Sequence, residues 1–243
     1  MGEVIPKRKI TREDVVVALT GSGVSAESGM PTFRGKDGLW KQYRAEELAT
    51  PEAFVRDPRL VWEWYDWRRS IIKRSEPNPA HLTLAEMERE LGPDGFLLIT
   101  QNVDGLHQRA GSKRVIEIHG NLWRMWCVRC GHMIEDLTTP LPEIPPKCPK
   151  CGALMRPDVV WFGEGPHDLD RAIAAARTAD VFLVIGTSGV VYPAASLPVM
   201  AKESGAYVIE FNIERTPVSE YADEVILGPV GKTLPEWWEK SRP

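Results

Sequence analysis

All four cysteines of this 243-residue chain lie in one block of 25 residues. They form two Cys-x-x-Cys pairs, Cys127 with Cys130 and Cys148 with Cys151, separated by 17 residues. This spacing is typical of a structural zinc site, in which four thiolates complete a tetrahedron around the ion. Disulfides, the alternative, are more often spread along a secreted chain. The sequence therefore predicts one structural zinc ion bound by these four residues.

Outside the cysteine block, short apolar runs alternate with helical patterns. The runs, which we expect to be buried strands, are Val15–Leu19, Phe96–Ile99, Val115–Ile118, Val181–Ile185, Tyr207–Phe211 and Glu224–Leu227. The expected helices are Pro58–Arg74, Pro79–Leu91, Leu169–Thr178, Pro193–Glu203 and Thr233–Lys240. This alternation predicts an α/β fold with a mostly parallel sheet that helices cover on both faces.

Two stretches interrupt the alternation and look like insertions. Residues 36–76 contain only helical or loop patterns, and residues 120–157 hold the cysteine block with a proline-rich centre. We interpret both as parts of one smaller, discontinuous domain, made of a helical piece and a zinc ribbon. Residues 1–35, 77–119 and 158–243 then form the larger domain that contains the parallel sheet.

Charge and hydropathy exclude several classes of protein. The chain has 34 acidic and 30 basic residues and a net charge of -4, so we expect no direct nucleic-acid binding. Its first residues are charged and lack the apolar stretch of a signal peptide. The apolar stretch 181–201 is interrupted by prolines and small polar residues, so no membrane span is expected. A cytoplasmic protein is the prediction.

Glycine-rich or polar segments follow several of the expected strands. Gly21–Ala26 follows the first strand and fits G-x-G-x-x-A, a turn whose backbone approaches a pyrophosphate. Gln101–His107 and His119 follow the next two strands. Ligands bind at the carboxyl edge of an open parallel sheet, so we expect these segments to converge there. The glycine pattern by itself is weak, because a tight turn without a ligand also fits it.

Two further positions at strand ends could serve a nucleotide-dependent reaction. No second strand ends in an acid about 20 residues after the glycine turn, where a dinucleotide-binding fold usually holds a ribose. Asn212 and Glu214 could take that role. His119 is a candidate general base, because an imidazole titrates near neutral pH. Three other histidines are interpreted as structural: His81, His107 and His167.

Together these segments resemble the sirtuins, a family of NAD-dependent protein-lysine deacylases. The resemblance rests on Gly21–Ser25, Pro31–Arg34, Thr100–Asp104, His119–Gly120, the paired cysteines, Gly186–Ser188 and Phe211–Asn212. Their order and spacing match from about Val15 to Pro235. The resemblance implies a large Rossmann-like domain and a small zinc domain, with NAD and an acyl-lysine protein substrate meeting in the cleft between them.

The resemblance also implies roles for individual residues. His119 is the base, and the zinc is structural. The residues implied in NAD binding are Gly21, Ser22, Gly23, Val24, Ser25, Ala26, Glu27, Thr32, Phe33, Arg34, Trp40, Gln101, Asn102, Val103, Asp104, Gly186, Thr187, Ser188, Asn212, Ile213, Glu214 and Val230. In the implied reaction the acyl oxygen attacks the nicotinamide ribose as nicotinamide leaves, and His119 then activates a ribose hydroxyl. The implied products are free lysine, nicotinamide and O-acyl-ADP-ribose.

One helix pattern bears on the choice of acyl group. Tyr65 and Arg68 stand at i and i+3, hence on one face of the expected helix Pro58–Arg74. One interpretation is a packed helix with a snorkelling arginine. However, Tyr-x-x-Arg, together with Ala45 and Ala49, resembles the sirtuin subclass that removes acidic acyl groups. Arginine suits a bidentate carboxylate contact, so we expect desuccinylase or demalonylase preference.

Other classes of function remain as alternatives. A zinc-ribbon interaction module would not explain the polar clusters at strand ends. A protein mono-ADP-ribosyltransferase would use the same NAD site, and product analysis distinguishes it because only deacylation yields O-acyl-ADP-ribose. A dehydrogenase is less favoured, since the usual ribose-binding acid is missing.

Overall fold

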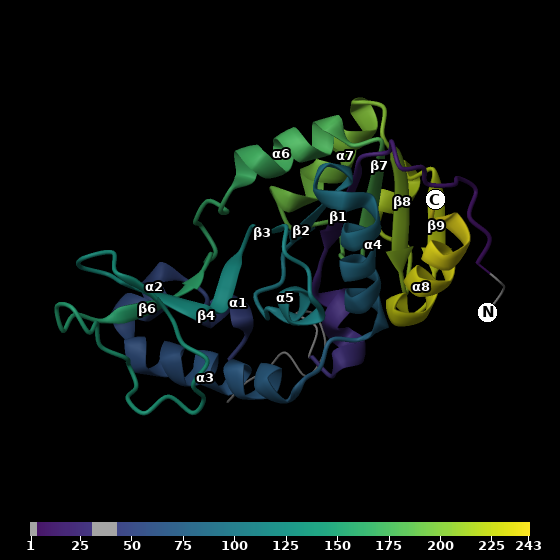
Figure 1. The fold of residues 1–243 in the computed structure, drawn as a ribbon. Helices are drawn as coiled ribbons and strands as arrows, with labels where there is room; N and C mark the ends of the chain where they lie inside the picture. The colour runs from purple at the N-terminus through teal and green to yellow at the C-terminus, as the bar shows by residue number, and fades with distance from the viewer. Residues whose placement is uncertain (1–3, 31–42) are drawn as a thin grey trace.

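The larger part of the molecule is a six-stranded parallel sheet. The structure is a computed structural model that describes residues 4–30 and 43–243. The sheet has the order β3-β2-β1-β7-β8-β9 (Figure 1). Its strands are β1 (Val16–Thr20), β2 (Phe96–Thr100), β3 (Val115–Glu117), β7 (Val181–Ile185), β8 (Tyr207–Asn212) and β9 (Glu224–Leu227). The chain builds outwards from β1 in one direction and then from β7 in the other, so the strand order reverses between these two neighbours.

Both faces of this sheet are apolar and covered by helices, as its buried strands require. On one face, Ala18 and Leu183 pack with Trp237 and residues of α4 (Pro79–Gly95) and α8 (Val230–Ser241). On the other face, Val17 and Val184 pack with residues of α6 (Leu169–Thr178) and α7 (Leu197–Glu203). Neighbouring residues of one strand therefore contribute to opposite cores, and Figure 1 shows the two helix layers.

A smaller unit lies beside the β3 edge of the sheet. Its three-stranded antiparallel sheet has the order β5-β4-β6. Its elements are β4 (Gly120–Cys127), β5 (Met133–Glu135), β6 (Met155–Val159), α1 (Ala45–Leu48), α2 (Pro51–Arg56) and α3 (Pro58–Arg74). Trp62 of α3 is buried and its indole N–H donates to the backbone oxygen of Met155 at 2.8 Å. The helical segment and the ribbon, far apart in sequence, thus share one core.

The remaining short elements connect these layers. They are the 3-10 helices η1 (Ser22–Ser28), η3 (Ala194–Ser196) and η4 (Pro217–Glu220), and the helix α5 (Leu106–Ala110). The longest helices have clear start signals: Asp57 caps α3 by accepting from Leu60 N, and Asn78 caps α4 by accepting from Ala80 N. Each cap is followed by a proline at the first helical position.

The predicted fold class is confirmed: a parallel α/β sheet carries a smaller antiparallel ribbon that contains the cysteines. Two local features differ from the sequence prediction. Most of the expected turn Gly21–Ala26 lies within the 3-10 helix η1, and the expected helix Pro193–Glu203 is divided into η3 and α7. The limits of the two domains stay a prediction. Within residues 4–30 and 43–243, no helix is long and apolar enough to cross a membrane.

Candidate active site

Two turns meet at the carboxyl ends of β1 and β7, where the strand order reverses. The N–H of Gly23 donates to the backbone oxygen of Gly186 at 2.8 Å, and Gly186 has a φ of 59°. A Cβ at Gly23 would lie 2.7 Å from that oxygen. Only a residue without a side chain fits, so the backbones of both turns stand at the point of an open α/β sheet where ligands bind.

Buried polar side chains line the same edge beside these turns. The hydroxyl of Ser25 donates to Asp104 Oδ2 at 2.8 Å, and Asn102 Nδ2 donates to the Ser25 oxygen at 3.1 Å. The backbone N–H of Leu106 donates to the other carboxylate oxygen of Asp104 at 2.9 Å. Burial raises the pKa of Asp104, while these hydrogen bonds favour its charged form. The structure thus joins the glycine turn after β1 to the polar segment after β2.

Two buried histidines extend this polar cluster. His81 Nε2 lies 3.4 Å from the Ser25 hydroxyl, and His107 Nε2 lies 3.0 Å from the Thr20 hydroxyl. Burial lowers the pKa of His81 to about 4 and that of His107 well below its usual value. Both imidazoles are therefore neutral at pH 7. The sequence interpretation kept His81 apart from the site. The helix start Asn78-Pro79 could have indicated a fixed position for His81, because His81 completes the capping box that begins at Asn78.

His119 stands at the end of β3 and faces the segment that follows β2. Its Nδ1 lies 3.1 Å from the backbone oxygen of Gln101. Because a carbonyl oxygen only accepts, Nδ1 carries the proton and Nε2 keeps the lone pair. Burial lowers the pKa of His119, the bond to Gln101 opposes this, and the charge of His167 lowers the pKa further. The imidazole is accordingly neutral near pH 7, the form that a general base needs.

Thr187 connects the ends of β2, β7 and β8. The amide of Gln101 donates to the Thr187 hydroxyl at 2.9 Å, and the amide of Asn212 donates to the Thr187 backbone oxygen at 2.8 Å. Residues from four strand ends therefore converge at one edge, as the sequence predicted from their positions. Ile213 and Glu214 lie beyond β8 and are exposed.

The other residues named from the sequence lie around this edge. Ser22 and Ser188 are half-buried at the two turns, and Val24, Val103 and Val230 are buried. Glu27 accepts a hydrogen bond from the backbone N–H of Gly231 at 2.7 Å and is itself exposed, as is its neighbour Ala26. Four positions implied in NAD binding lie outside the described residues: Thr32, Phe33, Arg34 and Trp40.

The four cysteines form one compact cluster in the ribbon. Their sulfur atoms all lie within 4.8 Å of one another, with the closest pairs 3.4 to 3.7 Å apart. A disulfide requires about 2.05 Å, so the sulfurs are not paired. A tetrahedral zinc ion with Zn–S bonds of about 2.3 Å separates its thiolates by about 3.8 Å. The donor set and spacing therefore fit one structural zinc ion held by Cys127, Cys130, Cys148 and Cys151.

The aromatic face of α3 is packed inside the smaller unit. Tyr65 is fully buried, and its hydroxyl oxygen accepts from the indole N–H of Trp161 at 2.8 Å. Arg68 is partly exposed, with its guanidinium carbon 5.0 Å from the ring centre of Trp64. Burial lowers the pKa of Arg68, and nearby Tyr65 and Asp104 act in the opposite direction. Arg68 is therefore the member of the predicted pair that solvent reaches, and it lies near the polar edge of the sheet.

These observations define a class of protein. Glycine turns bring two backbones together at the topological switch point, carboxamides and a carboxylate line the same edge, and a neutral imidazole stands beside them. This donor set suits the ribose hydroxyls, carboxamide and pyrophosphate of a dinucleotide. A four-thiolate cluster lies in the attached ribbon, away from this edge. The chain thus has the architecture of a zinc-containing, dinucleotide-dependent enzyme.

Comparison with known proteins extends this result. The model of the Sir2 family matches residues 21–193. An NAD-dependent protein deacylase of Aquifex aeolicus is 64% identical over 210 residues, which cover 86% of this chain and 87% of that protein. An NAD-dependent protein deacylase of Pyrococcus furiosus is 51% identical over 251 residues, covering 100% of this chain and 98% of that protein.

Solved structures are similar as well. A complex of a Sir2 homologue with NAD has a TM-score of 0.88 and 50% identity, covering 94% of this chain and 90% of that chain. A complex of Sir2 with a p53 peptide and NAD+ has a TM-score of 0.83 and 34% identity, with 94% of each chain covered. This chain belongs to the Sir2 family. It is an enzyme of that family, and the family resemblance drawn from the sequence is confirmed.

Proposed function

We propose that this chain removes acyl groups from lysine side chains of proteins in an NAD-dependent reaction. The observation that carries the proposal is the position of His119, a neutral imidazole at the carboxyl edge of the sheet beside Gln101, whose amide donates to Thr187 at the switch point. Membership of the Sir2 family supports it, because the relatives named above are NAD-dependent protein deacylases. The proposed partners are NAD and acylated-lysine proteins, in line with the peptide complex of the Sir2 neighbour.

The polar edge supplies the binding groups that this reaction needs. NAD, when bound, supplies the ribose carbon to which the acyl oxygen is transferred as nicotinamide leaves. Asn102 and Asp104 are held in place by Ser25, and we assign them to the nicotinamide and its ribose. Thr187 and Asn212 are joined by a hydrogen bond, and we assign them to the adenosine side. We assign the pyrophosphate to the two glycine turns, whose backbones approach each other closely at the switch point.

His119 performs the proton transfer in this proposal. Nε2 has the free lone pair, because Nδ1 donates to Gln101. The hydrogen bond to a backbone oxygen also fixes the tautomer and the orientation of the ring. Nε2 can therefore take a proton from a ribose hydroxyl, which becomes the nucleophile toward the transferred acyl group.

The pH dependence of kcat/KM should show this base. Only neutral His119 can accept a proton, so activity falls as the pH drops through the pKa of His119. Burial holds that pKa below its usual 6.5, and the midpoint of the acid limb should therefore lie below pH 6.5. His167→Gln should move the midpoint upward, because it removes a charge that lowers the pKa of His119. An acid limb centred above pH 6.5 in the unaltered enzyme would contradict the assignment.

We also propose that acidic acyl groups, succinyl or malonyl, are preferred. Arg68 is partly exposed, keeps its charge and lies on the α3 face that approaches Asp104. The Tyr65 ring packs against Arg68, with its centre 5.8 Å from the guanidinium carbon. Ala45 and Ala49, the small residues that accompany this pair in the resemblance, belong to the same buried core as Tyr65. A guanidinium that solvent reaches suits the terminal carboxylate of such an acyl group.

Arg68→Met tests this preference. A charge-assisted hydrogen bond contributes about 1.5–3 kcal/mol, so kcat/KM for a succinyl-lysine peptide should fall roughly tenfold to a hundredfold. Acetyl-lysine has no terminal carboxylate, and its turnover should change little. Arg59→Met, on the same helix but with its side chain 71% exposed, is the control. Equal losses on both peptides would assign Arg68 to the support of the helix and make the protein a general deacylase.

One assay tests the function itself. Acetyl-, succinyl- and malonyl-lysine peptides are incubated with and without NAD, and the products are separated by mass. The expected result is NAD-dependent loss of the acyl group with formation of nicotinamide and O-acyl-ADP-ribose. ADP-ribose attached to protein, with no O-acyl-ADP-ribose, would instead identify a mono-ADP-ribosyltransferase, which the names of the relatives do not favour.

A further inference from the structure

His119 lies in the link between the two sheets. β3 of the large sheet ends at Glu117 and β4 of the ribbon begins at Gly120, so only two residues join them. Gly120 has a φ of 82°, and a Cβ there would overlap the backbone oxygen of Asp158 on β6. The imidazole is therefore carried by a short crossing whose geometry depends on how the ribbon sits against the sheet.

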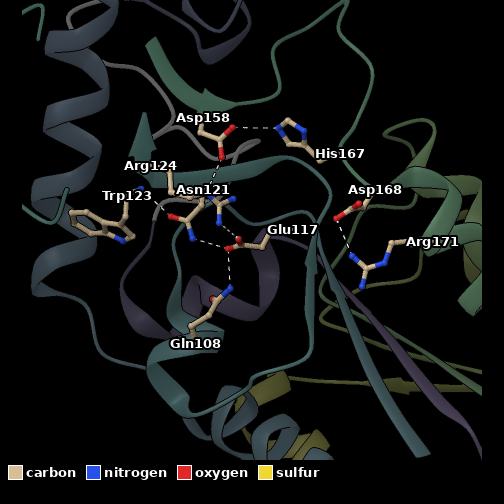
Figure 2. A network of polar contacts seen from close by, with 9 residues as sticks. All are labelled: Gln108, Glu117, Asn121, Trp123, Arg124, Asp158, His167, Asp168 and Arg171. Carbon is tan, nitrogen blue, oxygen red and sulfur yellow. Dashed lines mark hydrogen bonds and ion pairs between the residues drawn. The ribbon is translucent and has the colours of Figure 1, made fainter. Parts of the chain in front are cut away.

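A single arginine joins the two sides of this crossing. Arg124, on β4, donates through Nη1 to Glu117 Oε2 and through Nε to Asp158 Oδ2, each at 2.8 Å (Figure 2). Glu117 is the last residue of β3, the edge strand of the large sheet, and lies two residues before His119. Asp158 belongs to β6 of the ribbon. Their side chains are only 10% and 5% exposed, so the guanidinium is an important charged partner for both buried carboxylates.

Amide side chains hold Glu117 from two further directions. Its Oε1 accepts from Asn121 Nδ2 at 2.6 Å and from Gln108 Nε2 at 2.9 Å. Gln108 lies on α5 of the large part, whereas Asn121 lies on β4. Figure 2 shows these side chains pointing at one carboxylate. Glu117 is thereby fixed by groups from both sides of the crossing.

The segment that leads from β6 back to the large part of the molecule also contacts the link between β3 and β4. The backbone N–H of Val160 donates to the oxygen of His119 at 3.0 Å, and that of His167 donates to the oxygen of Ile118 at 2.9 Å. His167 also lies 3.5 Å from Asp158 through Nε2. The segment that leads from β6 back to the large part is thus hydrogen-bonded to Ile118 and His119, the two residues that join β3 to β4.

We propose that Arg124, by joining Glu117 to Asp158, is a positioning residue for the imidazole of His119. The three side chains set the angle at which β4 leaves β3, and this angle sets whether Nδ1 reaches the Gln101 oxygen and where Nε2 points. The inference rests on the proposed role of His119 as the base. A displacement of a catalytic group by about 1 Å can cost about a hundredfold in rate, so a small change of this crossing should be visible in kcat.

Arg124→Lys is the variant of choice. It keeps the positive charge, but one ammonium group cannot reproduce the two fixed N–H directions of the guanidinium. Arg124→Met is the more severe variant, and it can unfold the ribbon because it removes the guanidinium from two buried carboxylates and leaves His167 as the ionisable group beside Asp158. Arg8→Met is the matched control. Arg8 bridges Asp14 and the Asp180 backbone oxygen at the amino ends of β1 and β7, and its side chain is 30% exposed against 33% for Arg124.

Two readouts decide between positioning and simple stabilisation. We expect Arg124→Lys to lower kcat about tenfold or more with a smaller change in the KM for NAD. Nitrogen NMR of the free enzyme, which needs no turnover, should show a smaller fraction of His119 with its proton on Nδ1. Arg8→Met should change the Tm only. If Arg124→Lys lowers the Tm but leaves kcat and the His119 tautomer unchanged, Arg124 only stabilises the fold and the proposal is wrong. An unaltered enzyme without NAD-dependent turnover would instead contradict the proposed function.

Discussion

In the His119→Ala variant, kcat for an acyl-lysine peptide should fall about 10²–10⁴-fold, the usual loss for a general base. The imidazole is half-buried and is hydrogen-bonded to the backbone oxygen of Gln101. Its removal therefore leaves the glycine turns and the network around Asp104 in place. Calorimetry should give a Kd for NAD within a few-fold of the unaltered enzyme, and circular dichroism should show an unchanged fold.

The control for this variant is His132→Ala in the zinc ribbon, between β4 and β5. The backbone oxygen of His132 accepts from Cys127 N, and this contact does not need the imidazole. Turnover should stay near that of the unaltered enzyme. Unchanged turnover in His119→Ala would remove His119 from the mechanism, and a large loss of NAD affinity would show that its role is binding instead.

Much of the fold follows from local patterns that have one dominant cause. Buried parallel strands have no polar alternation, so Val181–Ile185 occupies the same residues in the structure as in the prediction. The partly buried edge strand Glu224–Leu227 also keeps its predicted limits. The helix Pro58–Arg74 is likewise unchanged, because Asp57 and Pro58 mark its start. Strong local signals and the final packing agree at these elements.

The ribbon could not be predicted in the same way. Pro157 lies within β6, where a proline normally argues against a strand. The pairing of β4 with β6 shifts register between Asn121 and Met125, so the alternation of side chains is broken there. In this unit the cysteine cluster and the shared core with α3 decide the conformation, and neither contact is visible in a local window of sequence.

The site shows the same division. Strand-end positions predicted that the glycine turn, Gln101 and His119 would share one edge, because parallel strands align their carboxyl ends. Which atoms meet is a tertiary property. The bond from Ser25 to Asp104 spans 79 residues, and the burial of Tyr65 against Trp161 spans 96. The sequence placed Tyr65 and Arg68 on one helix face, but only the packing shows that Arg68 alone is reached by solvent.

Replacement of one zinc ligand should affect the whole smaller unit. Cys127 and Cys148 are buried in the core that also holds Trp62 and Tyr65, so the metal and this core stabilise each other. Binding of zinc by small domains contributes an apparent free energy of about 10–16 kcal/mol to folding at pH 7. Cys148→Ser removes one of four thiolates, and we expect loss of zinc, unfolding of the ribbon and a strongly lowered Tm.

Activity should be lost indirectly in Cys148→Ser, because the crossing that carries His119 is paired with the ribbon through β4 and β6. The unaltered enzyme should contain one zinc ion per chain by elemental analysis, and a chelator strong enough to remove it should reproduce the effect of the substitution. Met133→Ser, a change at a half-exposed sulfur residue on β5, is the control and should retain both zinc and turnover. Full activity in metal-free protein would show that the core with α3 holds the ribbon without the ion, and that the cysteine cluster does not stabilise the active site.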